Sequence, residues 1–413
     1  MSKRPATMTI SLARARAHWH ASQGLAEAKG TRPDTVVERT GWPRTLGGVE
    51  AYVAIASRAS KASVGTINRA VQRGALRVVP AVRGCIYLVT KAEAPLLLRL
   101  ANHLSASRIQ RDLDKARVKK GEVERLAKSV SKWLADNGPA TTDKIRRGLP
   151  EGSVRSLGAA GKKVGVSSPL PPALRVLEFS GTIVRTLPGG RLDSERYEWA
   201  IADSPETSSA DPDELVDTVV KRFLRNAGPA TAKEIATWSG MPQRDIKASL
   251  GRLEAEELRV EDDKAAAFVL PGQSEGLAKP AERSTRIALL PFADNFVALR
   301  GGPRRLVDPQ FHDLPAEAWG GTRATTLGKA RHLASRPIAC GDEIVGMWEF
   351  DPDSQRVVHA LFAKVPRGAK TELRRAAEQL TAMINEIGHG HSFSLDTDDG
   401  QRRRVAGLKS LGS

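Results

Sequence analysis

Cysteine is scarce in this chain of 413 residues, which contains only Cys85 and Cys340. Two cysteines cannot build the disulfide framework of a small secreted protein, and these two do not form a Cys-x-x-Cys pair for zinc or an iron–sulfur cluster. We therefore expect both to be small buried side chains, and we expect the protein to need no cofactor.

Long apolar runs are also absent. No run reaches the roughly 18 residues that cross a bilayer, and residues 1–20 lack the apolar centre of a signal peptide. We expect no membrane partner and a cytoplasmic location.

Acidic residues are few relative to basic ones: 47 Asp and Glu stand against 64 Lys and Arg, which gives a net charge of +17. Hydrophobic residues make up 40% of the chain and charged residues 27%, an ordinary balance for a folded protein. The basic excess attracts polyanions, so nucleic acid is the first partner to consider. The alternative is a basic surface that serves only solubility.

Two histidine pairs and one glycine-containing loop are candidate ligand sites. His18-Trp19-His20 and His389-Gly390-His391 have no second cluster at metal-ligand spacing, so we expect no metal. The stretch 320–330, GGTRATTLGKA, has the wrong spacing for a phosphate loop and ends in alanine rather than a hydroxyl residue. We therefore expect no nucleotide-hydrolysing site.

An internal repeat organises the middle of the chain. Segments 131–154 and 221–246 both contain Gly-Pro-Ala-Thr after a hydrophobic helix end, and a short helix follows each threonine. Thr141 and Thr231 are therefore predicted N-caps. After each copy come a further helix and a strand pair, which is the order of a winged helix.

A similar order occurs earlier, with helices predicted at 32–38, 49–58 and 64–76 before a strand pair. After Gly272 the composition changes to β segments, and a helix with Leu373, Ala377, Leu380, Ile384 and Ile387 on one face closes the chain. The predicted fold is α+β, with three tandem winged helices and a C-terminal β-rich, barrel-like unit with a closing helix. The predicted domains are winged helices at 9–118, 119–205 and 212–272, and the β-rich domain at 283–413.

This arrangement resembles the AlkZ/YcaQ-like winged-helix DNA glycosylases, whose members excise alkylated bases or unhook interstrand crosslinks. The likeness covers nearly the whole chain. It is carried by the order and spacing of five stretches: SLARARAHWHASQGL (11–25), GGVEAYVAIASRA (47–59), VVPAVRGCIYLVTKAEAPLLL (78–98), IALLPFADNFVALR (287–300) and DEIVGMWEF (342–350).

The sequence departs from the family at its catalytic signature. Relatives have Gln, an apolar residue and then Gln or Asp, and these positions fall on Glu50, Ala51 and Tyr52. Relatives also commonly have histidine where this chain has Tyr87. The resemblance therefore implies a divergent member, in which fold and DNA binding carry over better than activity.

Glu50 and Tyr52 are the candidate catalytic residues. Cleavage of an N-glycosidic bond passes through an oxocarbenium-like state, and a carboxylate can position water and place negative charge near the sugar. Glu50 is thus a competent replacement for the first glutamine, whereas a phenol at Tyr52 would instead stack on a base or bond to a phosphate. The alternative is that Glu50 merely interacts with the dipole at a helix N-terminus.

The predicted partner is double-stranded DNA, whether damaged or not, bound by a monomer in the nucleoid. Its contacts are predicted in the wings and the first strand pair, where arginines reach phosphates or the minor groove. A non-catalytic winged-helix regulator and a basic protein-interaction module remain as alternatives. The predicted DNA-binding residues are Arg58, Lys61, Arg83, Arg175, Arg185 and Arg191.

Overall fold

The protein consists of two compact units. Unit 1 combines residues 1–67 with 216–413, and unit 2 is the inserted segment 68–215. Helices α4 (Val64–Gln72) and α10 (Pro212–Ala227) carry the chain from one unit to the other. The computed structural model describes residues 8–27, 32–204, 207–261, 263–278, 284–317 and 325–411.

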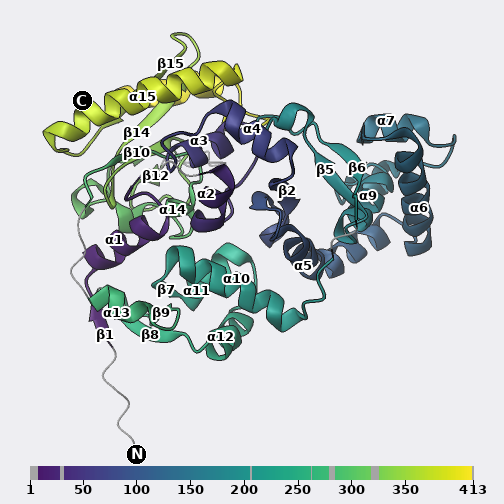
Figure 1. Ribbon diagram of the computed structural model, residues 1–413, viewed down its shortest axis with the longest axis horizontal. Helices are drawn as coiled ribbons and strands as arrows, with labels where there is room; N and C mark the ends of the chain where they lie inside the picture. Colours follow the sequence, from purple (N-terminus) through teal and green to yellow (C-terminus); the bar gives the residue numbers. More distant parts are fainter. Residues whose placement is uncertain are drawn as a thin grey trace, which may run out of the picture. The chain divides into compact units, whose positions relative to one another are not determined.

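Both units mix helices and strands, so the α+β class is confirmed (Figure 1). The other helices of unit 1 are α1 (Leu12–Ser22), α2 (Pro33–Thr40), α3 (Glu50–Ala56), α11 (Ala232–Ser239), α12 (Gln243–Arg252), α13 (Gln273–Ala278), α14 (Asn295–Ala298), α15 (Arg367–Ile387) and α16 (Asp398–Leu411). Its strands are β1 (Met8–Ile10), β7 (Ala230–Thr231), β8 (Glu256–Val260), β9 (Ala267–Val269), β10 (Ile287–Leu289), β11 (Pro315–Ala316), β12 (Thr325–Thr326), β13 (Arg336–Cys340), β14 (Glu343–Asp351) and β15 (Arg356–Leu361). Unit 2 contains β2 (Leu76–Pro80), β3 (Ile86–Thr90), α5 (Ala94–Lys115), α6 (Lys120–Asn137), β4 (Ala140–Thr141), α7 (Thr142–Gly148), α8 (Gly158–Lys162), α9 (Leu170–Phe179), β5 (Ile183–Thr186) and β6 (Glu198–Ile201). Within the described ranges, no helix has the length and apolar character that a membrane crossing requires.

The predicted C-terminal β segments form an antiparallel sheet of order β10-β13-β14-β15 in unit 1. Helix α15 packs on β10 and β15, and α16 packs on β14 and β15 (Figure 1). Strands β10 and β15 are the edges of the described sheet, so this region is an open sheet covered by helices rather than the expected barrel-like unit. Helix α16 was not expected, because most of its residues are polar. The predicted apolar face of α15 is buried: Leu373, Ala377, Leu380, Ile384 and Ile387.

The two copies of the repeat fold in the same order, except that the first contains one additional short helix, α8. In unit 2 the first copy runs from α6 through β4, α7, α8 and α9 to β5 and β6, whose strands pair in the order β4-β6-β5. In unit 1 the second copy runs from α10 through β7, α11 and α12 to β8 and β9, and β1 adds a parallel strand beside β8. The helices and the strand pair predicted for each copy are therefore present. The helices expected at 32–38, 49–58 and 64–76 correspond to α2, α3 and α4, with β2 and β3 as the strand pair that follows.

Both predicted N-caps are confirmed, but they differ in strength. The Thr141 side chain accepts the Lys144 N–H at 3.3 Å, and the Thr231 side chain accepts the Glu234 N–H at 3.1 Å. Only the second cap is reciprocal, because the Glu234 carboxylate accepts the Thr231 N–H at 2.7 Å. Lys144 stands at the corresponding position of the first copy, and its side chain has no acceptor atom to complete such a reciprocal pair.

Replacing Thr231 by alanine should therefore cost more stability than replacing Thr141. Loss of a single N-cap bond costs about 0.5–1 kcal/mol, and loss of the reciprocal cap should approach about 2 kcal/mol. Urea denaturation of the two alanine variants, followed by tryptophan fluorescence, measures the difference. Equal losses at the two sites would contradict the prediction.

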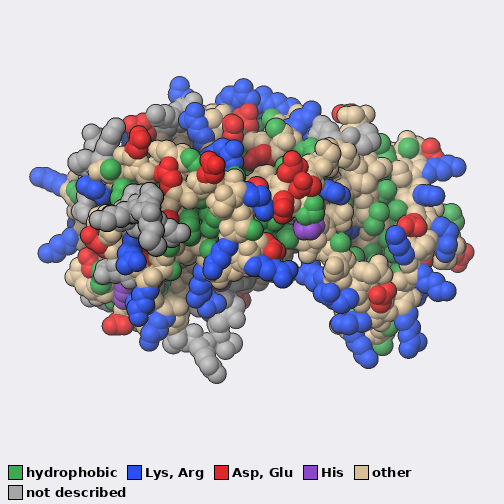
Figure 2. Space-filling view, turned by 90° about the horizontal axis from the view of Figure 1, so that it is seen from below, with side chains coloured by type: hydrophobic (Ala, Val, Ile, Leu, Met, Phe, Trp, Pro, Cys, Tyr) green, Lys and Arg blue, Asp and Glu red, His purple; other side chains and the backbone are tan. Residues whose placement is uncertain are grey.

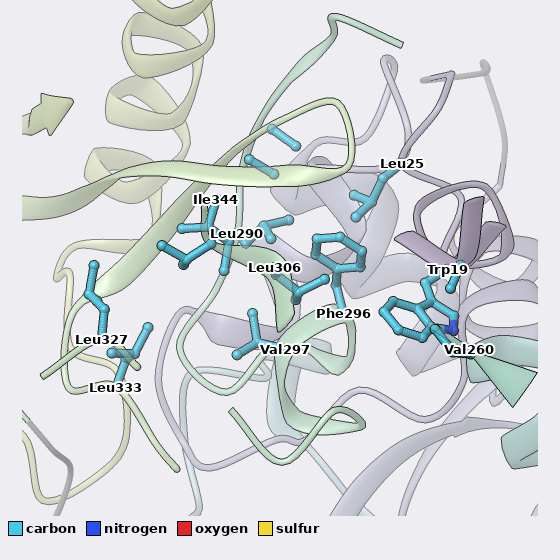
Figure 3. Close-up of a cluster of buried hydrophobic side chains, with 14 of the residues drawn as sticks. Trp19, Leu25, Val260, Leu290, Phe296, Val297, Leu306, Leu327, Leu333 and Ile344 are labelled. Carbon is cyan, nitrogen blue, oxygen red and sulfur yellow. The ribbon is translucent and has the colours of Figure 1, made fainter. Parts of the chain in front are cut away.

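The core of unit 1 draws on segments from both ends of the chain. Figure 3 shows Trp19 of α1, Val260 of β8, Phe296 of α14 and Ile344 of β14 in one cluster of buried side chains. Unit 2 has a separate core between α6, α9 and its sheet. Because residues before 68 and after 215 share one core, the N-terminal segment cannot complete its packing without the C-terminal half.

Cys85 and Cys340 are half-buried rather than buried as predicted. Cys85 immediately precedes β3 and Cys340 ends β13. Residues at strand ends lie closer to the surface than residues in strand centres, which accounts for the difference.

Candidate active site

The segment that leads into α3 fits closely against a C-terminal loop of unit 1. The Val49 N–H donates to the His391 carbonyl at 2.9 Å. A Cβ atom on Gly48 would lie only 2.3 Å from that carbonyl oxygen, and Gly47 has a φ of 72°, which glycine adopts without strain. The glycine pair therefore permits the approach that fixes Glu50 at the start of α3.

Glu50 is buried, with 4% of its side chain exposed. Its Oε1 accepts a hydrogen bond from Arg336 Nε at 2.8 Å and lies 2.7 Å from Arg336 Nη2. Its Oε2 accepts the backbone N–H of Phe292. Since both oxygens are held, the carboxylate has one fixed orientation, and its place at a helix N-terminus adds the favourable dipole contact expected from the sequence.

Arg336 continues this contact into a chain of buried charges. Its guanidinium also pairs with Glu349 of β14, and Glu349 pairs with Arg404 of α16. Arg404 holds Asp396 in a bidentate pair at 2.7 and 3.1 Å. All the members are at most 8% exposed. We call this set the charge chain: Glu50, Arg336, Glu349, Arg404 and Asp396.

The charge chain contains three carboxylates and two guanidiniums. Burial raises the pKa of the Glu50 carboxyl above its ordinary value, although the adjacent Arg336 guanidinium opposes the rise. The raised pKa makes the ionised Glu50 carboxylate a stronger proton acceptor than an ordinary glutamate.

A small cavity lies beside Glu50. Its volume is about 20 Å³, which is room for one water molecule. The residues that line it include two acids, Glu50 and Asp294, and two arginines, Arg44 and Arg58. Arg58 and Asp294 form a bidentate ion pair at 2.8 and 2.9 Å, with side chains that are 3% and 2% exposed. The cavity is thus a polar pocket in which a single water would meet charged groups.

A larger groove in unit 1 adjoins this cavity, because Thr40 and Arg58 line both. The groove has a volume of about 560 Å³ and lies along the end of α1, helix α2 and part of α10. The other charged residues of its lining are Glu27, Glu38, Arg39 and Arg225.

The structure does not bring Tyr52 to the cavity. Two residues correspond to about 200° around a helix, so Tyr52 projects from the side of α3 opposite Glu50. Its side chain is 0% exposed. The base stacking or phosphate contact expected for its phenol requires exposure, which the buried Tyr52 lacks.

Two of the arginines predicted to bind DNA are interior. Arg58 donates to the Gln23 and Ala54 carbonyls besides Asp294. Arg185 pairs with Glu178 at 2.6 and 3.1 Å, stacks over two aromatic rings at 5.0 and 4.9 Å, and has 9% of its side chain exposed. Because these guanidiniums are bonded inside the protein, neither is retained as a DNA contact.

The other predicted DNA contacts lie nearer the surface. Lys61 and Arg83 are exposed, and Arg83 stands in the turn of the β2–β3 hairpin with a φ of 57°. Arg175 is half-buried, and Arg191 pairs with Asp193 at 2.6 Å while 41% of its side chain stays exposed. Contact between these four residues and DNA stays a prediction.

Unit 2 carries a basic excess of its own. Its residues 68–215 include 25 Lys and Arg against 17 Asp and Glu, a net charge of +8 out of the +17 of the chain. Figure 2 shows Lys and Arg side chains distributed over the surface of this unit. One exposed basic cluster follows the end of α5 and the start of α6: Arg108, Arg111, Lys115, Arg117, Lys119 and Lys120.

In the part of the chain that the structure describes, no group of three or more His, Cys, Asp or Glu side chains is placed to hold a metal ion. Burial lowers the pKa of both His18 and His20, that of His20 to about 4. His391 instead bonds to Asp398 at 3.0 Å, beside the ring of His389.

Sequence reasoning missed Arg336, Glu349 and Asp294. Each is a charged residue within an apolar stretch, as in GMWEF (346–350) and LLPFAD (289–294). A charge that must be buried needs a partner, so these acids were a signal of a buried ion-pair network. Their partners are far away in sequence, and the sequence could not identify them.

Comparisons with known proteins agree with this fold. A family model described as DNA glycosylase AlkZ-like matches residues 48–383. The solved structure of Streptomyces sahachiroi DNA glycosylase AlkZ is similar with a TM-score of 0.70 and 20% sequence identity, over 93% of this chain and 98% of that one. A search of the curated proteins gives no match.

Proposed function

The chain belongs to the AlkZ-like DNA glycosylase family, and on that premise we propose that it hydrolyses the N-glycosidic bond of damaged bases in double-stranded DNA, with Glu50 acting on the attacking water. The observation that carries the proposal is the fixed, buried Glu50 carboxylate beside a cavity of about 20 Å³. Glu50 stands at the first position of the family's catalytic signature. The cavity beside its carboxylate has room for the water molecule that this position would hold.

The chemistry requires little besides water and negative charge. In an N-alkylated base the ring is already cationic, so the base leaves readily and little general acid is needed. The oxocarbenium-like sugar that develops is stabilised by a nearby carboxylate, and the same carboxylate can accept a proton from the attacking water. The described residues that line the cavity include no lysine, which fits hydrolysis by water rather than a Schiff-base intermediate.

The groove beside the cavity is the proposed site for the damaged nucleotide. At about 560 Å³ it is large enough for an extruded base, and it adjoins the cavity at Thr40 and Arg58. Enzymes that act on a base must take it out of the helical stack. A base in this groove would bring its sugar toward Glu50.

DNA binding is proposed to use winged helices at 9–118, 119–205 and 212–272, followed by the domain at 283–413. Both repeat copies begin with a helix and a short strand, continue with helices and end with a strand pair, and this shared order supports the division; the first copy has one additional short helix, α8. The exposed Lys61 and Arg83 and the basic surface of unit 2 are the proposed phosphate contacts. Such binding should weaken steeply as salt rises, because each phosphate contact releases counterions.

Substitution of Glu50 tests the proposal. Single-turnover assays on duplexes that carry N7-methylguanine should yield abasic sites with the wild-type chain. Glu50→Ala should lower the rate by at least about 100-fold. Glu50→Gln should lose less, because the amide carbonyl can still hold the water. Glu343→Gln is the matched control, since Glu343 pairs with Arg16 and does not line the cavity.

The fixed pairing of Glu50 with Arg336 also favours one other candidate, a non-catalytic DNA-binding regulator in which Glu50 only joins two segments of unit 1. Absence of abasic product from the wild-type chain, together with salt-sensitive DNA binding, would reject the glycosylase and support the regulator. Thermal melting of each variant establishes that a lost rate does not reflect unfolding.

A further inference from the structure

Asp294 occupies a position that the family signature does not describe. It ends the Pro291–Asp294 turn, in which the Asp294 N–H donates to the Pro291 carbonyl at 3.3 Å. Two residues earlier in the same turn, the Phe292 N–H donates a hydrogen bond to the Glu50 carboxylate. One short turn therefore holds the Glu50 carboxylate and also supplies a second acid to the same cavity.

This turn is strained between its two functional contacts. Ala293 has a φ of 55°, in the left-handed region that residues with a Cβ atom seldom adopt. Strain of this kind persists only where the surroundings impose it, and it clusters at functional sites. Here the strained backbone allows the Phe292 N–H to bond to Glu50 while the Asp294 side chain bonds to Arg58.

The hydrogen bonds of Asp294 leave capacity for one more donor. Its Oδ1 accepts Arg58 Nη2 and the Phe296 N–H, both at 2.8 Å, whereas its Oδ2 accepts only Arg58 Nη1, at 2.9 Å. A carboxylate oxygen accepts two hydrogen bonds, so Oδ2 has one place left. A water molecule in a polar cavity needs two to four partners.

The two acids also differ in charge balance. Asp294 is matched one to one by Arg58 in a bidentate ion pair. Glu50 belongs to the charge chain, in which carboxylates outnumber guanidiniums. A proton released between them would therefore pass to Glu50.

From this geometry we infer that Asp294 is the second carboxylate of the site and holds the attacking water between itself and Glu50. The inference rests on the proposed function. In the reaction the water oxygen forms a bond to C1′ of the sugar while the bond from C1′ to the base breaks. The electron pair leaves with the base, and one water proton passes to Glu50.

The first test is a crystal structure of the full chain at a resolution that reveals ordered water. The inference expects one water within hydrogen-bond distance of both Glu50 and Asp294. A cavity without that water, or a water that contacts only one of the two acids, would overturn the inference.

The second test fills the cavity without changing a charge. Ala54 lines it one turn after Glu50, whereas Ala56 of the same helix does not. Ala54→Val should lower single-turnover release of N7-methylguanine by about 100-fold with unchanged DNA affinity, because a displaced nucleophile costs that much. Ala56→Val should keep the wild-type rate.

Asp294→Asn is the direct variant, expected to lower the maximal rate at least about 10-fold at unchanged Kd for DNA. Asp294→Asn leaves Arg58 without its counter-charge. Should this variant fail to fold, the rate of Ala54→Val and the crystallographic water test the inference in its place. An active wild-type chain with a full rate in Ala54→Val would overturn the inference and leave the proposed function standing. An inactive wild-type chain would reject the proposed function, and the catalytic role of Asp294 with it.

Discussion

Replacement of Arg336 by methionine should destabilise unit 1 by about 3–5 kcal/mol. The guanidinium is 0% exposed and pairs with both Glu50 and Glu349. It also lies over the Trp348 ring at 4.9 Å. Methionine fills much of the same volume, but it leaves the buried Glu50 carboxylate without a counter-charge and leaves Glu349 with Arg404 alone. The loss of a partner, rather than a cavity, is therefore the main cost.

Urea denaturation measures this loss, and Arg402→Met is the matched control. Arg402 also contacts two acids, Asp353 at 3.0 Å and Asp399 at 2.7 Å, but 46% of its side chain is exposed. Exposed pairs contribute little, so the control should leave the unfolding midpoint almost unchanged. Similar midpoints for the two variants would mean that the charge chain does not hold unit 1 together.

The second large effect is expected for Gly48→Ala, which should lower the free energy of unfolding by at least about 3 kcal/mol. The added Cβ would lie 2.3 Å from the His391 oxygen, 2.5 Å from the Ser392 carbonyl carbon and 2.6 Å from the Phe393 nitrogen. All three are backbone atoms, so no side chain can rotate away. The loop at 391–393 or the start of α3 must move, and with it the carboxylate of Glu50.

Gly251→Ala is the control for Gly48→Ala. Gly251 lies within α12, and a Cβ there would meet nothing within 4 Å. Alanine is the better helix former, so this variant should be more stable than the wild type by about 0.5–1 kcal/mol. Thermal melting separates the two outcomes by sign. A Gly48→Ala variant as stable as the wild type would show that the loop yields easily.

The local features of this fold could be predicted from the sequence. Thr141 and Thr231 were identified as N-caps because a capping bond spans only three residues, and the face of α15 followed from its spacing. The α+β class came from the alternation of such elements along the chain. What failed was closure of the C-terminal sheet into a barrel, since strand pairing across β10 and β15 depends on contacts between distant segments.

Only the part of the candidate site that contains Glu50 could be predicted from the sequence. The position of Glu50 at a helix start was evident, and so was its relation to the family's catalytic glutamine. Arg336 lies 286 residues away from it, and Asp294 lies 236 residues away from its partner Arg58. No local pattern connects such pairs. For that reason the sequence predicts a DNA contact for Arg58, whereas the structure buries it against Asp294.

The discontinuity of unit 1 has a consequence for protein synthesis. A ribosome adds roughly 5–20 residues per second, so the 286 residues between Glu50 and Arg336 take tens of seconds to make. The synthesis of unit 2 is completed during that interval. Glu50 meanwhile still lacks Arg336 as its partner, and the cavity beside it lacks Asp294 until residue 294 has been added. The cavity beside Glu50 can therefore form only after most of the polypeptide has emerged, and a chain interrupted before Arg336 would contain unit 2 without the complete surroundings of Glu50.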